Sequence, residues 1–287
     1  MQEISGRVAA ITGAASGIGR ALAINFAQRG CHISISDVNE EGLAETVEQA
    51  SCYGVKVTHQ KLDVADRAAV YAWADKTAED HGKVNFIINN AGVAVGAPVE
   101  QMQYEDIEWL MGINFWGVVY GSKAFLPYIK SAGEGAIVNV SSVFGFMGIP
   151  TQSAYCSAKF AVKGFTESLI QELHIEGSGI KAICVHPGGI KTNIAASARV
   201  SAEIKELADA EKVDLTKDFH KIARTTPDKA AKTIITGIEK GKRRVLIGAD
   251  AKAIDKAQRW FPLGYQRVLE TVAKFGEKKR KQKLIKA

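Results

Sequence analysis

Short apolar runs alternate with longer amphipathic segments along most of the 287 residues of the chain. The apolar runs have the length and composition of buried β-strands and lie at residues 8–12, 33–36, 55–62, 86–89, 136–141, 180–185 and 245–247. The amphipathic segments have the length of helices and lie at residues 17–29, 41–49, 68–80, 104–129, 154–175 and 227–240. This alternation predicts right-handed βαβ crossovers, and therefore an α/β protein whose mostly parallel, seven-stranded sheet has helices on both faces.

Two stretches interrupt the alternation. Residues 188–226 join a predicted strand to a predicted helix. They greatly exceed the usual connection of about two to six residues, so we expect a loop that covers the substrate. Residues 251–287 follow the last strand and are expected to form a C-terminal helix and a basic tail. Because no linker or repeat divides residues 1–250, we predict that they form one domain.

The formal net charge of +6 is concentrated at the C-terminus. Residues 276–287 contain six Lys or Arg and one Glu, a net charge of +5, which leaves +1 for the rest of the chain. Nucleic-acid-binding proteins usually spread basic residues over a folded face, so we expect no nucleic-acid partner. The tail follows Trp260, Phe261 and Tyr265. It has two interpretations, a packed helix with a solvated charged end or a weak contact with an anionic membrane surface.

Composition bounds the class of protein further. Hydrophobic residues make up 46% of the chain, enough for a sizeable core. No run approaches the roughly 18 apolar residues of a membrane span, and the N-terminal residues show no signal-peptide pattern. The four cysteines lack C-x-x-C spacing and the histidines lack metal-ligand spacing, so we expect free thiols and no metal. These features predict a cytoplasmic protein.

A glycine-rich turn joins the first predicted strand to the first predicted helix. It reads T-G-A-A-S-G-I-G and contains Gly13, Gly17 and Gly19. Glycines at such a junction permit a tight turn, close backbone approach to a pyrophosphate and close packing of the helix on the sheet. The helix N-terminus also offers unpaired N–H groups to an anion. The turn therefore predicts a dinucleotide phosphate site.

Asp37 closes the second predicted strand, 24 residues after Gly13. A carboxylate there accepts hydrogen bonds from the adenosine ribose hydroxyls and repels a 2′-phosphate. No basic residue occupies positions 15, 16 or 38 to bind that phosphate. The expected cofactor is therefore NAD rather than NADP.

Tyr155 and Lys159 stand four residues apart in Y-C-S-A-K, and Ser142 precedes the tyrosine by 13 positions. On a helix, residues four apart share a face, so the Lys159 ammonium can lie beside the Tyr155 phenol. A free phenol has a pKa of about 10. We expect the nearby cation to lower that pKa and to make the proton mobile near neutral pH. Ser141 is the competing hydroxyl beside Ser142.

These motifs occur together, with N-N-A-G at residues 89–92, in the order and spacing of one known family. Over roughly residues 5–250 the chain resembles the short-chain dehydrogenase/reductase family. The resemblance implies a doubly wound, Rossmann-type domain that binds a nicotinamide cofactor at the carboxyl ends of its strands.

The resemblance also implies the catalytic roles. Tyr155 would be the general acid and base, Ser142 would hold the carbonyl oxygen, and Lys159 would bind the nicotinamide ribose as well as tune the tyrosine. Asn114 matches the family asparagine at a kink in a long helix. The residues implied to contact the cofactor are Gly13, Ser16, Gly17, Ile18, Gly19, Asp37, Asp63, Val64, Asn90, Ala91, Gly92, Tyr155, Lys159, Pro187, Gly188, Ile190 and Thr192.

The sequence therefore predicts an oxidoreductase that moves a hydride between NAD and a secondary alcohol or ketone. The stretches expected to set specificity, 93–97, 143–153 and 188–226, are rich in apolar residues and favour a hydrophobic substrate. One alternative is a protein that senses NAD or acts as a scaffold without turnover; another is enoyl reduction or epimerisation on the same fold. The long helices predicted at 104–129 and 154–175 pair across subunits in the family, so a homodimer or homotetramer is expected.

Overall fold

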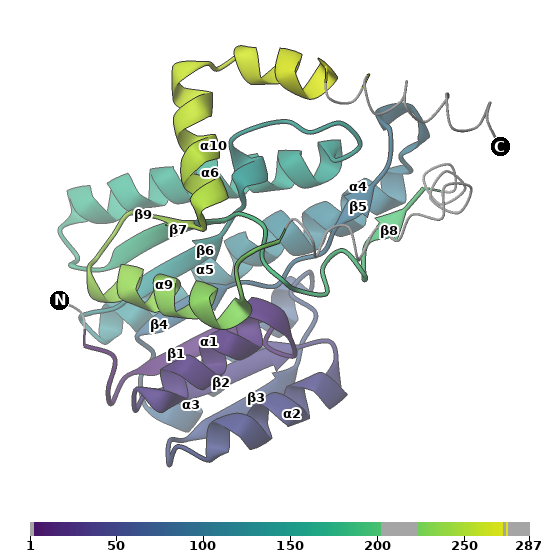
Figure 1. The fold of residues 1–287 in the computed structure, drawn as a ribbon. Coiled ribbons are helices and arrows are strands. Elements are labelled where there is room, and N and C mark those ends of the chain that lie inside the picture. Colours follow the sequence, from purple (N-terminus) through teal and green to yellow (C-terminus); the bar gives the residue numbers. More distant parts are fainter. Residues whose placement is uncertain (1–2, 202–222, 272–273, 275–287) are drawn as a thin grey trace.

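A sheet of seven parallel strands forms the centre of the computed structural model, which describes residues 3–201, 223–271 and 274 (Figure 1). The strand order is β3-β2-β1-β4-β6-β7-β9. These strands are β1 (Val8–Thr12), β2 (His32–Asp37), β3 (Val57–Lys61), β4 (Phe86–Asn89), β6 (Ala136–Val140), β7 (Lys181–Pro187) and β9 (Arg244–Ile247). The predicted seven-stranded parallel sheet is therefore confirmed, with β3 shorter than the expected 55–62.

The strand order reverses beside β1. Along the chain, strands are added outward from β1 to β2 and β3, and then on the other side of β1 from β4 to β9. At such a switch point the connections from neighbouring strands leave in opposite directions, which opens a crevice at the carboxyl ends of β1 and β4. The glycine-rich turn after β1 and the N-N-A-G segment after β4 both lie at this crevice.

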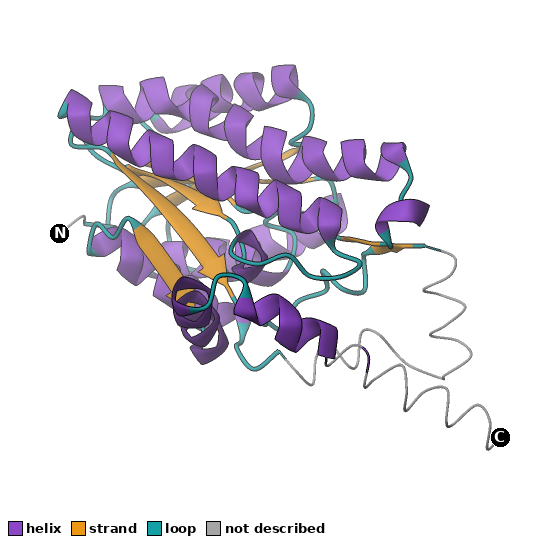
Figure 2. Cartoon of the chain, turned by 90° about the horizontal axis from the view of Figure 1, so that it is seen from above, coloured by secondary structure: helices purple, strands orange, loops and turns teal. Residues whose placement is uncertain are grey.

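Helices cover both faces of the sheet, as Figure 2 shows from above. The long helices are α1 (Gly17–Gln28), α2 (Glu40–Ser51), α3 (Arg67–His81), α4 (Tyr104–Met111), α5 (Gly117–Ser131), α6 (Ser153–Glu176), α9 (Pro227–Glu239) and α10 (Ala249–Trp260). Short helical turns are η1 (Val99–Gln101), the π-helical η2 (Gly112–Trp116) and η3 (Val143–Gly145). Within the described ranges, none of these helices is both long and apolar enough to cross a membrane.

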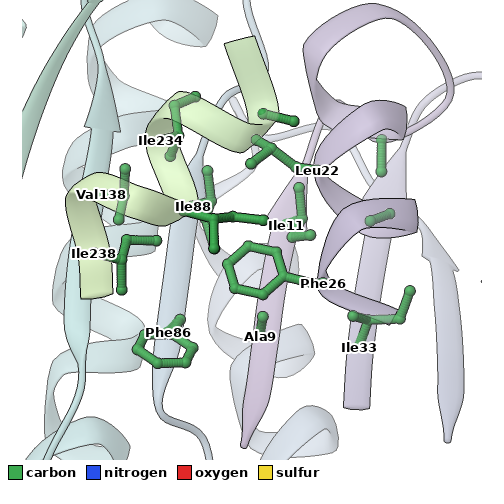
Figure 3. Packing of buried hydrophobic residues seen from close by; sticks show 14 of the residues in the cluster. Ala9, Ile11, Leu22, Phe26, Ile33, Phe86, Ile88, Val138, Ile234 and Ile238 are labelled. Carbon is green, nitrogen blue, oxygen red and sulfur yellow. The ribbon is translucent and has the colours of Figure 1, made fainter. Parts of the chain in front are cut away.

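Alternate residues of each strand face opposite layers. Ala9 and Ile11 of β1 belong to the apolar cluster shared with α1, α2 and α9, whereas Ala10 belongs to the cluster shared with α3, α5 and α6. In the first cluster the Phe26 and Phe86 rings stack with centroids 5.9 Å apart (Figure 3). Because the central strands β1, β4 and β6 are buried on both faces, their residues read as continuous apolar runs rather than as alternating ones.

The second face is closed by a different aromatic pair. Trp73 of α3 meets Phe125 of α5 edge to face, with centroids 5.0 Å apart, and both side chains are almost fully buried. The Trp73 indole N–H donates a hydrogen bond to the Ser34 hydroxyl at 3.0 Å, so its polar group is also satisfied. Burying rings of this size contributes about 1.5–3 kcal/mol each to folding.

The helix predicted over residues 104–129 is divided at Asn114, where the family resemblance implied a kink. The structure has α4 and α5 with the five-residue π-turn η2 between them. The π-turn contains Asn114, whose side chain forms hydrogen bonds with the Val93 backbone, outside the helix.

The stretch 188–226 also differs from a simple loop. Its residues Arg199–Val200 form β8, which pairs in parallel with β5 (Val95–Gly96) as a separate two-stranded sheet. Ile190 forms a further parallel bridge with Thr225. Residues 202–222 of the stretch lie outside the described residues.

After β9, α10 ends at Trp260 and a second helical segment begins at Gly264. The helix predicted there is thus two segments, separated by a turn that contains Pro262. The basic run at 276–287 lies outside the described residues.

Candidate functional site

The glycine-rich turn between β1 and α1 is shaped by close backbone contact. Gly13 has φ +67°, in the left-handed region, and an added Cβ would lie 2.8 Å from the Ala91 Cα. A Cβ on Gly19 would lie 2.0 Å from the Gly13 carbonyl oxygen. The Asn90 amide donates to the Thr12 and Gly13 carbonyls at 3.0 and 3.2 Å, which ties the turn to the end of β4. Only glycine fits at Gly13 and Gly19 without displacing this backbone.

The N-terminus of α1 faces the same crevice with its N–H groups available. Within α1, described in full, the N-cap Ser16 makes no side-chain capping bond and the first turn holds no acidic residue. Gly17 has φ +54°, and an added Cβ there would lie 3.1 Å from the Thr192 Cγ2. Because unpaired N–H groups and the helix dipole favour an anion, this end of α1, with Ile18 and Gly19, suits a pyrophosphate.

Asp37, at the end of β2, borders the turn on one side. Its carboxylate accepts hydrogen bonds from the Ala15 and Asn39 backbone N–H groups at 2.9 and 3.0 Å. The sequence analysis did not weigh Arg20, whose guanidinium contacts the Ala15 carbonyl in this region. That guanidinium also forms an ion pair with Glu45 at 2.7 Å, so its charge is already engaged.

Asp63 and Val64 follow β3 at the neighbouring part of the sheet edge. The Asp63 carboxylate is exposed and accepts a hydrogen bond from the Ala65 N–H at 2.9 Å. Val64 is 6% exposed, and an added Cβ on Gly117 would lie 2.8 Å from its side chain. The pair thus sits where β3 meets the start of α5.

Tyr155 and Lys159 lie one turn apart on α6, facing Ser142 at the N-cap of η3. The Ser142 hydroxyl lies close enough to the Tyr155 phenol to influence its pKa, and it accepts a hydrogen bond from the Phe144 N–H at 3.1 Å. The Lys159 Nζ lies 5.6 Å from the Tyr155 ring centroid and donates to the Val140 carbonyl at 3.0 Å. The three side chains named by their spacing in the sequence are therefore brought together at the end of β6.

The two adjacent serines point in different directions. The Ser141 hydroxyl donates to the Lys159 backbone carbonyl at 2.8 Å and so joins β6 to the α6 backbone. An added Cβ on Gly145 would lie 2.5 Å from the Ser141 Oγ, so glycine is needed for this approach. Ser142 is the serine whose hydroxyl reaches the Tyr155 phenol.

Asn114 is fully buried in the π-turn. Its side-chain oxygen accepts from the Val93 N–H, and its amide donates to the Val93 carbonyl, both at 2.8 Å. An added Cβ on Gly92 would lie 3.3 Å from the Asn114 Oδ1 and 3.6 Å from the Lys159 Nζ. The π-turn thus holds the 92–93 backbone against the lysine that the sequence analysis assigned to the site.

Burial dominates the ionisation of the tyrosine and the lysine. It raises the pKa of Tyr155 to about 12, although the nearby Ser142 hydroxyl acts to lower it. Burial lowers the pKa of Lys159 to about 8. The expected lowering of the tyrosine pKa is wrong for this structure, because burial of the phenol has the largest effect and raises its pKa. The Lys159 ammonium lies over the ring and donates to the Val140 carbonyl. At neutral pH the phenol is a proton donor.

The segment after β7 closes the crevice on the other side. Pro187 pairs with Ile247, and the Gly188 N–H donates to the Ile247 carbonyl at 2.9 Å. Ile190 is 4% exposed and is held by its bridge to Thr225. Together with the Thr192 contact to Gly17, these bonds place the segment across the N-terminus of α1.

Sequence reasoning missed two side chains from the C-terminal region that hold the walls of the site. The Asp250 carboxylate accepts from the Gly189 N–H at 2.6 Å, and an added Cβ on Gly188 would lie 2.1 Å from it. The Tyr265 hydroxyl accepts from the Gly148 N–H at 3.2 Å. The only signal in the sequence was the position of Asp250 directly before the predicted C-terminal helix, where an acidic residue ordinarily reads as helix stabilisation.

The residues present fit a dinucleotide. The glycine positions form a cradle that any Cβ would fill, the α1 N-terminus suits phosphate, and Asp37 suits a ribose diol. The carboxyl end of β6 then places a phenol, a hydroxyl and an ammonium at the same edge. A nicotinamide would supply redox chemistry there, while the protein supplies a proton and the orientation of the reactants.

Comparisons of the sequence and of the structure with known proteins both lead to the same family. The family described as short chain dehydrogenase matches residues 7–203. SadH of Mycobacterium tuberculosis, named as an oxidoreductase, is 46% identical over 276 residues, which span 96% of this chain and 98% of SadH.

Two further proteins bear on the chemistry. The 3-oxoacyl-[acyl-carrier-protein] reductase FabG of Thermotoga maritima is 36% identical over 189 residues, 66% of this chain and 76% of FabG. A short chain dehydrogenase/reductase from Burkholderia phymatum, solved in complex with NAD, superimposes with a TM-score of 0.81. It is 29% identical and the match covers 91% of this chain and 95% of that one.

Proposed function

Because this chain belongs to the short-chain dehydrogenase/reductase family of nicotinamide-dependent oxidoreductases, we propose that it transfers a hydride between NAD and a hydrophobic secondary alcohol or ketone. The observation that carries the proposal is the grouping of the Ser142 hydroxyl, the Tyr155 phenol and, one helical turn further along α6, the buried Lys159. These three groups lie at the same sheet edge as the glycine cradle.

In the direction of reduction, Tyr155 donates its proton to the carbonyl oxygen and Ser142 holds that oxygen by a hydrogen bond. A phenol whose pKa is raised to about 12 is protonated before the reaction, which suits this donor role. Lys159 and Asn114 keep the polar wall of the site in place through their bonds to Val140 and Val93. When bound, the nicotinamide supplies the hydride.

We propose NAD as the preferred cofactor. The Asp37 carboxylate at the end of β2 would accept hydrogen bonds from a ribose diol and repel a 2′-phosphate. Arg20, whose guanidinium approaches the turn, is ion-paired with Glu45. The Burkholderia relative in complex with NAD supports this choice.

The proposed substrate class rests on the apolar surroundings of the tyrosine. Tyr155 packs against a cluster of buried apolar residues that includes Val95 and Leu110, and the Phe144 ring meets it edge to face at 6.0 Å. A site with apolar walls and few polar groups favours a hydrophobic alcohol or ketone over a sugar. The name of the FabG relative, a 3-oxoacyl reductase, supports carbonyl reduction.

The test is a panel of ketones and secondary alcohols, assayed by nicotinamide absorbance with both NAD and NADP. For any substrate found, Tyr155→Phe should lower kcat by at least about 100-fold, the usual worth of a positioned acid. The exposed Tyr104 gives a matched control, and Tyr104→Phe should leave kcat unchanged. Equal turnover by Tyr155→Phe and the wild type would remove Tyr155 from the mechanism.

The same assays, extended to activated alkenes and epimerisable sugars, separate the alternatives. Tight NAD binding with no turnover of any carbonyl or alcohol would favour a cofactor-sensing or scaffold protein. Turnover of activated alkenes or epimerisable sugars, but not of ketones, would favour one of the other nicotinamide-linked reactions.

We also propose a homodimer or homotetramer formed through the long helices. Trp116 at the end of η2 and Phe160 on α6 are 47% and 44% exposed, an unusual position for large apolar side chains. Size-exclusion chromatography with light scattering gives the oligomeric state. A paired substitution, Trp116→Ser with Phe160→Ser, should lower it, whereas an unchanged mass would exclude this surface.

A weak contact with an anionic membrane surface is a second proposal, carried by an exposed apolar group at the C-terminal helices. Trp260, Phe261, Leu263 and Val268 are between 62% and 79% exposed, ahead of the basic residues of the sequence tail. Sedimentation with anionic and with neutral vesicles tests it. Binding only to anionic vesicles, reduced by Trp260→Ser and by deletion of 276–287, is expected; binding to neither would contradict it. We also propose that the protein resides in the cytoplasm, either bound weakly to the membrane surface or free.

A further inference from the structure

His186 is a fully buried residue of β7 that lies directly against the turn carrying Ser142. Its ring Nδ1 lies 3.0 Å from the Ser142 backbone carbonyl oxygen. The Phe146 ring stacks on the imidazole with centroids 4.2 Å apart. The proposed chemistry uses no proton of this histidine, so its contact with Ser142 needs another explanation.

The contact fixes the tautomer of the ring. A carbonyl oxygen only accepts hydrogen bonds, so the imidazole must carry its proton on Nδ1. Burial lowers the pKa of His186 to about 4, so the ring is neutral near pH 7. The Nε2 atom has no hydrogen-bond partner among the described residues, so the Ser142 carbonyl is the ring's one hydrogen-bonding contact there.

Two donors converge on that carbonyl. The Gly145 N–H donates to it at 3.0 Å, which closes the η3 turn, and His186 approaches it from the neighbouring strand. Ser142 has extended backbone angles, φ −164° and ψ 169°, immediately before the turn. Rotation of the peptide after Ser142 would break both bonds and reorient the backbone from which the hydroxyl projects.

The imidazole is itself held by a stack that reaches α10. The Arg244 guanidinium lies over the Phe146 ring in a cation–π contact, 4.5 Å from the ring centroid. It also forms an ion pair with Asp255 at 3.1 Å. The Asp255 side chain is only 13% exposed. Phe146, one of the apolar residues in the stretch expected to line the substrate, is therefore engaged behind the turn instead. Arg244 and Asp255 lie outside the matched segment 7–203.

We propose that His186 is a positioning residue for Ser142: by donating from Nδ1 to the Ser142 carbonyl, it holds the serine hydroxyl against the Tyr155 phenol. The inference rests on the proposed function for its kinetic consequence. The stack of Phe146, Arg244 and Asp255 keeps the imidazole plane in place and couples α10 to the serine turn.

The chain offers a matched pair of substitutions. Asn places an amide donor near the position of the imidazole Nδ1, whereas Leu fills a similar volume without a donor. His186→Leu should lower kcat by about 10- to 100-fold, the range expected for a misplaced reacting group, with little change in the KM for NAD. His186→Asn should recover kcat to within about threefold of the wild type. The same two substitutions at the exposed His174 of α6 serve as controls and should change neither constant.

Two further measurements do not depend on turnover. Nitrogen chemical shifts of the His186 ring in the wild-type protein should show a protonated Nδ1 and a bare Nε2 near pH 7. Amide exchange of Gly145 should be faster in His186→Leu than in His186→Asn, because only the latter keeps the donor on the shared carbonyl. If the wild type turns over no substrate, the proposed function fails while these two readouts still decide the role of His186.

The proposal is overturned by any of three results. These are a ring protonated on Nε2, equal Gly145 exchange in both variants, or a His186→Leu enzyme with wild-type kcat. If His186→Leu does not fold, the test relies on the ring tautomer of His186 in the wild type and on the kcat of His186→Asn. A kcat for His186→Asn more than about tenfold below the wild type would then count against it.

Discussion

The Asp37 carboxylate accepts a hydrogen bond from the Ala15 backbone N–H at 2.9 Å. One side chain therefore braces the glycine-rich turn and also presents a negative charge where the adenosine ribose of a dinucleotide would lie. These two roles can be separated by substitution, because one depends on a hydrogen-bond acceptor and the other on charge.

Asp37→Asn keeps an acceptor for the Ala15 N–H and removes the charge. We expect the ratio of kcat/KM for NAD to kcat/KM for NADP to fall at least about tenfold, equivalent to about 1.4 kcal/mol, because the 2′-phosphate is no longer repelled. Steady-state assays with both cofactors measure the ratio. Glu41→Gln, which removes an equal charge from an exposed position on α2, should leave it unchanged. A constant ratio in Asp37→Asn would mean that the carboxylate does not select the cofactor.

The lowered pKa of Lys159 predicts the pH dependence of carbonyl reduction. Its ammonium is kept up to about pH 8 and lost above it, because burial disfavours the charged form. Tyr155 remains protonated over this range, since its pKa is raised to about 12. The kcat for reduction should therefore be level from about pH 6 to about pH 8 and fall above it. A rate that stays level to about pH 10, with protein stability unchanged, would show that the Lys159 charge does not contribute.

Two glycine-to-alanine substitutions should have opposite effects on stability. In Gly19→Ala the new Cβ would meet the Gly13 carbonyl oxygen at 2.0 Å, so the turn must move and about 1–3 kcal/mol should be lost. In Gly164→Ala, on the exposed face of α6, the Cβ meets nothing within 4 Å, and about 0.5–1 kcal/mol should be gained. Urea denaturation with intact oligomers measures both. Equal stability of the two variants would contradict the tight packing of the turn.

Acid should destabilise the fold through its buried histidines. Burial lowers the pKa of both His81 and His186 to about 4, from 6.5 in the unfolded chain. Between these values the unfolded chain binds more protons than the folded chain, so the free energy of unfolding falls as the pH falls through this window. For His186 the loss between pH 7 and pH 5 should be about 2 kcal/mol. Denaturation curves of His186→Asn should show a smaller loss than the wild type; identical losses would contradict the neutral buried ring.

The centre of the sheet was predictable because its strands are buried on both faces. All five residues of β1 are buried, so residues 8–12 read as an unbroken apolar run, and the same holds for β4 and β6. The pair β5 and β8 was missed because each strand has only two residues, too few to show a period. The distortion at Asn114 was expected only from the family resemblance, because the apolar pattern of α4 runs on into α5 without a break and gives no local sign of the π-turn.

The candidate site was predictable where chemistry depends on local spacing. The interval between Tyr155 and Lys159 and the glycines of the turn are sequence-local signals, and the structure brings these residues to one edge of the sheet. The contacts of Asp250, Arg244 and His186 join residues from separate elements, so no local sequence pattern predicts them. The pKa of Tyr155 was mispredicted for a related reason, since spacing shows that a cation is near but not how deeply the phenol is buried.

Residues 188–226, which are expected to help set substrate specificity, are anchored near both ends by main-chain hydrogen bonds. On one side the Arg199 and Ser201 N–H groups donate to the Ala94 and Gly96 carbonyls, each at 3.0 Å, and on the other the Lys191 N–H donates to the Thr225 carbonyl at 2.9 Å. Such bonds do not depend on side-chain identity. The sequence between these two anchors can therefore vary without loss of the bonds that hold its ends. Under the proposed function, such variation would change which alcohol or ketone enters while Ser142, Tyr155 and Lys159 keep their places.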